Sequence, residues 1–212
     1  MRAPLDLRLC AASCRAFASL FSVPTESPRS YPVSVLEEEA AAIAPAKTLS
    51  ICLINPRFEP SYWGFEYALP LYPGQKRSTM ISGSLATVAG MCGDHDVCLL
   101  DENIEDIDWE SLRRFDIVGV TGMNVQKRRI REILLKLRQR DIFTVVGGPF
   151  VSVQEEFFDG LCDVKFVGEA ETTWPQFLDD YSRGNPTEQR YEQTEPTDMA
   201  RSPRPRYDLL KV

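Results

Sequence analysis

Glycines and small polar residues stand at the ends of three apolar runs in this chain. The runs close on Thr121-Gly122-Met123-Asn124, on Gly147-Gly148-Pro149 and on Gly168-Glu169. Glycine lets a ligand approach the backbone closely and tolerates positive φ angles. Exposed amides at the start of a following helix favour an anionic group such as a phosphate. A tight turn alone would explain one such end, but three of them favour a ligand-binding rim.

The elements that would hold this rim alternate between strands and helices. Nearly continuous apolar runs predict buried strands, and amphipathic stretches between them predict helices. The expected strands cover residues 48–56, 96–103, 116–124, 142–149 and 162–169, and the expected helices cover 82–93, 108–115, 125–140, 151–161 and 172–184. This order predicts an α/β fold, a doubly wound and mostly parallel five-stranded sheet of the Rossmann or flavodoxin-like kind.

Ligands of such sheets bind beyond the carboxyl ends of the strands, where the strand order reverses. The common ligands are poorly supported by the motifs of this chain. The stretch "NPRFEP" after the first strand contains no G-x-G-x-x-G, and no G-x-x-x-x-G-K-[ST] is present. A flavin-binding domain would need a hydroxyl-rich phosphate loop there. Asn55 and Thr121 occupy the positions where a receiver domain carries its acids.

Composition excludes several classes of protein. A formal net charge of −7 argues against a nucleic-acid surface, and the basic run "QKRRIREILLKLRQR" is better explained as the solvated face of a helix. No apolar run is long enough to span a membrane. The six cysteines form no regular framework, which indicates a reducing compartment and predicts a cytoplasmic protein.

The two ends of the chain differ from the middle. Residues 1–47 read as a poorly ordered extension, although an organellar transit peptide also fits their arginines and scarce acids. Residues 48–184 carry the α/β pattern. Residues 185–212 are polar and rich in proline, which predicts a linker that closes on the apolar "YDLLKV".

From Leu49 to Val212 the chain resembles the N-terminal cobalamin-binding domain of cobalamin-dependent radical S-adenosylmethionine enzymes. Five segments carry the resemblance in order: "LINPRFEPSYWGFEYALPL", "LATVAGMCGDHDVCLLDENIEDI", "DIVGVTGMN", "VVGGPFVS" and "VGEAE". The first of these is especially similar to the subgroup that includes hopanoid methylases. The resemblance implies that a corrin ring lies over the strand ends and that its nucleotide tail runs down into the domain.

Residue by residue, the resemblance implies three groups of cofactor contacts. The ends of the third and fourth strands would line the tail and the ring edge, the end of the fifth strand would close the other side, and the first loop would face the corrin. The implied cobalamin-binding residues are Asn55, Pro56, Phe58, Trp63, Thr121, Gly122, Met123, Asn124, Gly147, Gly148, Pro149, Gly168 and Glu169. No catalytic residue and no metal ligand is assigned.

The chain departs from related proteins at three places. Many cobalamin domains outside the group carry D-x-H-x-x-G after the first strand, whereas the sole histidine here, His95, lies in an expected turn, so cobalamin would lack a histidine ligand. "TMISGSLATV" replaces the P-P-L-G that usually begins the family's first helix. The C-x-x-x-C-x-x-C triplet that holds a [4Fe–4S] cluster for S-adenosylmethionine is absent; Cys10 and Cys14 have its first spacing, but Phe17 stands in the third position.

These observations favour a cobalamin-binding module truncated or split from a radical methyltransferase, which would not be catalytic alone. Its partners would be cobalamin and a separate radical domain or subunit. The alternative is a degenerate α/β domain that acts as a protein-interaction module without a cofactor. A complete enzyme is disfavoured because the single histidine has no obvious nucleophile beside it, although acids such as Asp101, Glu102, Glu169 and Glu171 stand near strand ends.

Overall fold

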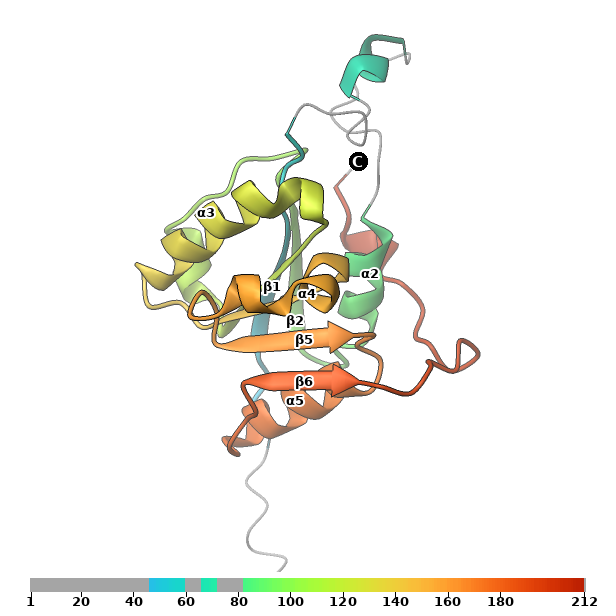
Figure 1. Cartoon of the computed structure of the whole chain (residues 1–212). Helices are drawn as coiled ribbons and strands as arrows, with labels where there is room; N and C mark the ends of the chain where they lie inside the picture. The colour runs from blue at the N-terminus through green and yellow to red at the C-terminus, as the bar shows by residue number, and fades with distance from the viewer. Residues whose placement is uncertain (1–45, 60–65, 72–81, 212) are drawn as a thin grey trace, which may run out of the picture. The chain divides into compact units, whose positions relative to one another are not determined.

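The structure, a computed structural model, describes residues 46–59, 66–71 and 82–211 (Figure 1). Its centre is a sheet in which each strand runs parallel to its neighbours, in the order β2-β1-β3-β4-β5-β6. The strands are β1 (Ser50–Asn55), β2 (Asp96–Asp101), β3 (Ile117–Thr121), β4 (Thr144–Gly147), β5 (Val164–Gly168) and β6 (Arg190–Gln193). The predicted doubly wound parallel α/β fold is confirmed.

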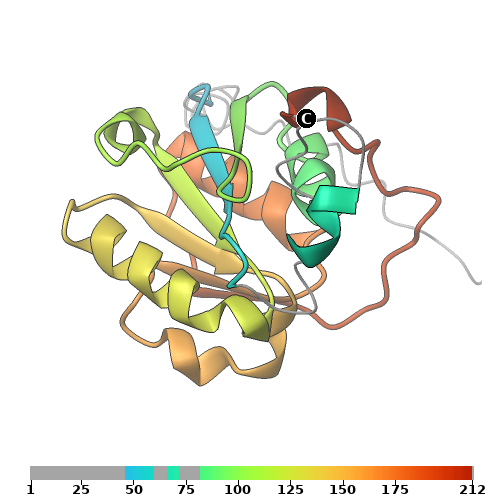
Figure 2. The same ribbon diagram turned by 90° about the horizontal axis from the view of Figure 1, so that it is seen from above.

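Helices cover both faces of this sheet, as the view from above shows (Figure 2). They are α2 (Gly83–Gly90), α3 (Lys127–Arg138), α4 (Pro149–Val153) and α5 (Thr173–Arg183), with short 3₁₀ turns η1 (Glu66–Leu71), η2 (Ser111–Arg114), η3 (Asn124–Gln126), η4 (Glu155–Phe158) and η5 (Tyr207–Leu209). Because side chains alternate along a strand, the strands β1 to β5 contribute apolar side chains to two separate cores, and β6 contributes Tyr191 to one of them. One core lies against α2 and α5, and the other lies against α3 and α4.

The helices form where apolar residues recur at helical spacing. In α3, Ile130, Ile133, Leu134 and Leu137 are each at most 2% exposed, while the intervening arginines and lysines face solvent. The predicted basic run is therefore the outer face of a packed helix. The helix α5 ends where Gly184 adopts a left-handed conformation, φ 73°.

Two of the expected helices are shorter and tighter than the sequence pattern predicts. Residues 108–115 form only the 3₁₀ turn η2. The helix expected over 151–161 begins at Pro149 and breaks at Gln154, whose φ of −143° and ψ of 60° separate α4 from η4. The break lets Phe150, Phe157 and Phe158 meet with ring centroids 5.0–5.2 Å apart, so packing overrides the local helical pattern.

In the part of the chain that the structure describes, the sheet has six strands, so the predicted number of five was wrong. The sixth, β6, lies within residues 185–212, where composition predicted a linker. Its sequence "RYEQ" contains one apolar residue, Tyr191, which is 6% exposed and stacks on Phe166 with ring centroids 5.2 Å apart. An edge strand needs only this inward-facing side chain, and its outward positions remain polar. No continuous apolar run therefore marks it.

The remaining sequence predictions meet the structure only in part. The extension predicted over 1–47 lies outside the described residues except for its last two. All four cysteines in the described ranges, Cys52, Cys92, Cys98 and Cys162, are free thiols. Among the helices in the part of the chain that the structure describes, none is long and apolar enough to cross a membrane.

Candidate functional site

The strand order reverses between β1 and β3, because β2 lies on one side of β1 and all later strands lie on the other. The carboxyl ends of these parallel strands meet at one edge of the sheet. A rim of this kind, at the switch point, is where open α/β sheets bind their ligands. The structure therefore places the predicted glycine-bearing ends of β3, β4 and β5 along a single edge.

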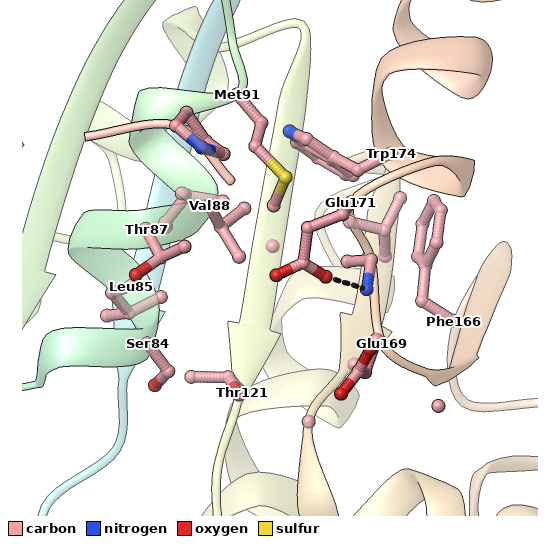
Figure 3. Close-up of a pocket in the computed structure, with 18 of the residues that line it drawn as sticks. Ser84, Leu85, Thr87, Val88, Met91, Thr121, Phe166, Glu169, Glu171 and Trp174 are labelled. Atoms are coloured by element: carbon pink, nitrogen blue, oxygen red, sulfur yellow. Dashed lines mark hydrogen bonds between the residues drawn. The ribbon is translucent and has the colours of Figure 1, made fainter. Parts of the chain in front are cut away.

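A cavity of about 570 Å³ opens beside this rim, on the face of the sheet that α2 and α5 cover (Figure 3). The strands supply its floor, α2 one wall, and Trp174 with the loop before α5 the opposite wall. Its lining residues are Leu53, Ser84, Leu85, Thr87, Val88, Met91, Gly119, Val120, Thr121, Val145, Val146, Gly147, Gly148, Phe166, Gly168, Glu169, Ala170, Glu171, Trp174, Met199, Ser202, Pro203 and Pro205. This volume lies within the range of small-molecule sites.

Small residues at matching heights on neighbouring strands make room for the cavity. Val145 pairs with Gly119, and Gly147 pairs with Thr121, all facing the same side of the sheet. A Cβ added at Gly119 would lie 2.7 Å from Cδ2 of Leu53, and one at Gly147 would lie 3.4 Å from Cβ of Phe166. Glycine inside a strand commonly marks such a close approach. Here the absence of a side chain at these two positions leaves space for the cavity.

Gly148 and Gly168 are required by the fold itself. Gly148 has φ 98°, and a Cβ there would lie 2.3 Å from Oγ1 of Thr121. Gly168 has φ 81°, and its Cβ would lie 2.8 Å from the carbonyl oxygen of Gln193 in β6. The sequence analysis attributed the bare backbone at these positions to a ligand. The structure shows that neighbouring protein atoms leave no room for a side chain at either position, so glycine is required even without a ligand. Both residues also line the cavity.

The cavity walls are mostly apolar and lead back to a buried thiol. Met91 and Trp174 face one another across the cavity, with Val88 beside them (Figure 3). The indole N–H of Trp174 donates a hydrogen bond to Sγ of Cys92, 3.3 Å away. Burial raises the pKa of Cys92 to about 11, so this thiol stays protonated at neutral pH and behaves as a small hydrophobe.

Two acids stand at the mouth of the cavity and bind the chain that follows β6. Oε2 of Glu169 accepts a hydrogen bond from the amide of Thr197, and Oε2 of Glu171 accepts one from its hydroxyl. The hydrogen bonds from Thr197 lower the pKa of Glu169. Both carboxylates therefore fasten the segment after β6 to the end of β5 and the loop that follows it.

The rim at β1 and β2 is filled by a hydrogen-bonded network. The side-chain amide of Gln126 donates to Oδ1 of Asn55, at 3.3 Å, and to the carbonyl oxygen of Pro56, while its Oε1 accepts from the amide of Met123. The amide of Phe58 donates to Oδ1 of Asn103, 2.9 Å away. Gln126 is 1% exposed. This network fixes the first loop against the start of α3.

An ion pair between Glu102 and Arg129 strengthens the same corner. The side chains of these residues are 3% and 12% exposed, and Nε of Arg129 lies 2.9 Å from each carboxylate oxygen. Oε2 of Glu102 also accepts a hydrogen bond from the amide of Arg57. A largely buried carboxylate with this many donors is a structural anchor, and Glu102 is thus not free to act as a general base.

The structure brings five of the sequence-predicted cobalamin-binding residues to the cavity and leaves the others elsewhere. Thr121, Gly147, Gly148, Gly168 and Glu169 line it. The rest do not: Asn55, Pro56, Phe58, Gly122, Met123, Asn124 and Pro149 lie along the rim beside it, and Trp63 is outside the described residues.

Sequence reasoning missed the helical walls and much of the cavity floor, namely Leu53, Gly119, Val120, Val145, Val146 and Phe166. Val88 of α2, Met91 directly after α2 and Trp174 of α5 look like ordinary core residues in a helical pattern. Gly119 carried a usable signal, because glycine inside an otherwise β-branched run is unusual. The contribution of Pro203 and Pro205 could not be foreseen, since composition alone places prolines in linkers.

His95 lies away from the rim. Its Nδ1 accepts a hydrogen bond from the amide of Leu49, 3.2 Å away, immediately before the first residue of β1. That position is at the amino ends of the strands, the edge opposite to the cavity mouth. His95 does lie in the turn expected before the second strand.

The fold and the cavity together define a doubly wound α/β ligand-binding domain with its site at the switch point. Residues 78–178 match the family model of the B12 binding domain. The resemblance drawn from the sequence is thereby confirmed.

Curated relatives of this chain include methyltransferases. Over 162 residues the chain is 32% identical to an uncharacterized methyltransferase of Synechocystis sp. This match covers 76% of the chain and 30% of the relative. It is 26% identical over 128 residues to the hopanoid C-2 methylase of Rhodopseudomonas palustris, a match that covers 60% of the chain and 24% of the relative. It is 32% identical over 99 residues to a bacteriochlorophyllide d C-8(2)-methyltransferase of Chlorobaculum tepidum, a match that covers 46% of the chain and 21% of the relative. The chain thus spans less than a third of each of these relatives.

Proposed function

We propose that this domain binds cobalamin, with the nucleotide tail in the cavity between the sheet and α2 and the corrin ring over the rim. The observation that carries this proposal is the cavity itself. It is lined mainly by apolar side chains, and it opens at the switch point of a fold whose residues 78–178 match the family model of the B12 binding domain. A flat aromatic base with its sugar fits a site of this size, whereas the whole cofactor would extend onto the rim.

The residues present suit such a tail. Met91, Val88 and Trp174 offer apolar surface for an aromatic base, and sulfur and indole groups pack favourably against aromatic rings. The hydroxyl of Thr121 and the backbone of Gly147 and Gly148 stand at the mouth, where the polar sugar–phosphate part would pass. These residues would bind and orient the cofactor and would shield its base from water.

The protein offers no imidazole to the cobalt at this rim. The sequence contains one histidine, His95, and it is bonded at the opposite edge of the sheet. With its base held in the cavity, bound cobalamin would therefore carry neither its own benzimidazole nor a protein histidine on the metal. We expect the absorption spectrum of the complex to show this base-off form.

The reaction that we propose for the complete system is methyl transfer. Two of the named relatives are methylating enzymes. When bound, cobalamin supplies a cobalt centre that can carry and donate a methyl group. The iron–sulfur cluster and S-adenosylmethionine would belong to a radical domain or subunit outside the described residues. The chain's own residues would hold the cofactor and would perform no bond-breaking step alone.

Cobalamin binding is tested by incubating the purified protein with hydroxocobalamin and removing the free pigment by gel filtration. We expect the corrin absorption to stay with the protein. In the variant Val88→Trp the indole fills the cavity, so retention should fall at least about tenfold, or about 1.4 kcal/mol of binding free energy. The matched control is Leu135→Trp, on the outer side of α3.

Three outcomes separate the interpretations. Retention that Val88→Trp abolishes and Leu135→Trp preserves, with both variants folded by circular dichroism, supports the proposal. Equal retention by both variants would contradict binding in this cavity. No retention by the unmodified protein would favour an interaction module without a cofactor.

A further inference from the structure

The segment from Thr197 to Lys211 forms part of the cavity although composition predicts a linker. Figure 2 shows the chain that follows β6 looping outward and returning to lie beside α2. Met199, Ser202, Pro203 and Pro205 line the cavity along this path. The segment therefore supplies a third wall, beside α2 and the loop that precedes α5.

The first anchor of this wall is Thr197. Its amide donates to Oε2 of Glu169 at 2.9 Å, its hydroxyl donates to Oε2 of Glu171 at 3.3 Å, and its Oγ1 accepts from Nε2 of Gln193 at 2.8 Å. Glu169 and Glu171 themselves line the cavity. The start of the wall is thus tied to the residues that form the mouth.

The second anchor is a backbone contact with α2. The amide of Arg206 donates to the carbonyl oxygen of Ala86 at 2.8 Å. A Cβ added at Gly90 would lie 2.5 Å from the carbonyl oxygen of Arg204, which is closer than real Cβ atoms come to backbone oxygen. The wall can dock on α2 only because residue 90 is glycine.

Beyond this anchor the chain stays on the domain. Leu209 and Leu210 pack against the core beneath α2, and Nζ of Lys211 lies 2.6 Å from Oε2 of Glu105. Yet no residue from 194 to 211 is buried, and Met199 is 74% exposed although it borders the cavity. A segment with so little buried surface opens at low free-energy cost.

We propose that residues 197–206 are a movable wall of the cobalamin cavity, which opens to admit the nucleotide tail and docks on α2 once the tail is bound. This inference rests on the proposed function. A tail in the cavity would cover Met199 and the two prolines, and would therefore favour the docked wall. By linkage, docking of the wall strengthens cofactor binding by the same factor as bound cofactor favours docking, so a variant that leaves the wall mostly undocked binds the cofactor more weakly.

Limited trypsin digestion measures the opening, because the bond between Arg201 and Ser202 lies in the middle of the wall. We expect saturating hydroxocobalamin to slow cleavage at this bond about tenfold, as binding to the closed form requires. The fragment beginning at Ser202 is followed by mass spectrometry. Pigment retention is measured on the same samples.

Two glycine variants of α2 provide the matched comparison. Gly90→Ala pushes the Arg204 carbonyl away, so it should speed cleavage without ligand and weaken pigment retention about tenfold. Gly83→Ala adds the same methyl group to the same helix, with nothing nearer than the Tyr207 hydroxyl at 3.9 Å, and should match the unmodified protein. Alanine favours helix over glycine, so α2 remains formed in both variants.

The outcomes distinguish this inference from the proposal beneath it. If the unmodified protein retains pigment but cleavage is the same with and without hydroxocobalamin, the movable wall is overturned and cobalamin binding stands. The same holds if Gly90→Ala frees the segment but binds pigment as tightly as Gly83→Ala. If the unmodified protein retains no pigment, the proposed function falls, and the wall falls with it.

Discussion

The two faces of the sheet are built from the same strands but serve different purposes. Toward α3 and α4 the strands present Ile54, Val118, Val120 and Val146, all at most 3% exposed and packed on the helices. Toward α2 and α5, at nearly the same heights, they present Gly119, Thr121 and Gly147. The first face is closely packed and contributes most to the stability of the fold. The second face is packed less closely and contains the cavity. A binding site here results from placing small residues on one side only.

The largest expected effect comes from removing a ring on the closed face. Phe158 is 1% exposed and meets the rings of Phe150 and Phe157, so Phe158→Ala should lower the free energy of unfolding by about 4 kcal/mol. Met91→Ala, on the face with the cavity, should cost only about 1 kcal/mol because Met91 already borders empty space. Urea denaturation measures both; equal losses would contradict the contrast between the faces.

The ion pair at the rim of β1 and β2 gives the next largest effect. Arg129→Met leaves Glu102 nearly buried without its cation and should cost about 3 kcal/mol of unfolding free energy. The neighbouring Arg128 has a side chain that is 78% exposed, so Arg128→Met should change stability by less than about 0.5 kcal/mol. If the two variants melt alike, Glu102 is not the anchor described above.

The cavity floor is probed by two glycines that differ in their surroundings. Gly119→Ala forces Leu53 to turn into the cavity, and should cost about 1.5 kcal/mol of stability and weaken hydroxocobalamin retention about tenfold. Gly147→Ala meets nothing nearer than Cβ of Phe166 at 3.4 Å and should leave stability within about 0.5 kcal/mol. A larger loss of stability from Gly147→Ala than from Gly119→Ala would refute this description of the floor.

The smallest effect concerns Asp116, at the opposite edge of the sheet. Partial burial works against its charged form, but hydrogen bonds from Lys47 and from the amide and hydroxyl of Ser50 lower the pKa of Asp116 overall. A lowered pKa in the folded state contributes stability above the pKa of the unfolded state, about 3.9, and this contribution is lost as the pH falls through the folded value.

Asp116→Asn should accordingly destabilise the protein by about 1 kcal/mol at pH 7. The difference from the unmodified protein should shrink as the pH falls below about 4. Thermal melts between pH 3 and pH 7 give the comparison. A difference that stays constant over this range would mean that the charge of Asp116 contributes nothing.

The sequence was sufficient for the strands and the rim because these depend on long apolar runs and on glycine. It was insufficient wherever one residue decided the outcome. The edge strand β6 depends on Tyr191 alone, and the break after α4 depends on three phenylalanines that come together only in the folded protein.

Contacts between residues far apart in the sequence also explain some residues differently from the sequence analysis. Gly148 is small because Thr121 lies against it, and Pro203 is part of a wall because Gly90, more than a hundred positions earlier, leaves room for the neighbouring Arg204. Neither relation has a local signature. The predicted rim along the strand ends is present in the structure, while the helical walls and the C-terminal wall of the cavity beside it could be seen only in the structure.

The crystal structure of the protein loaded with hydroxocobalamin tests the central claim most directly. It should show the benzimidazole in contact with Val88, Met91 and Trp174, and no protein side chain on the lower face of the cobalt. A tail that remains on its own cobalt or lies in solvent, with the space between α2 and the sheet empty of ligand, would contradict the account.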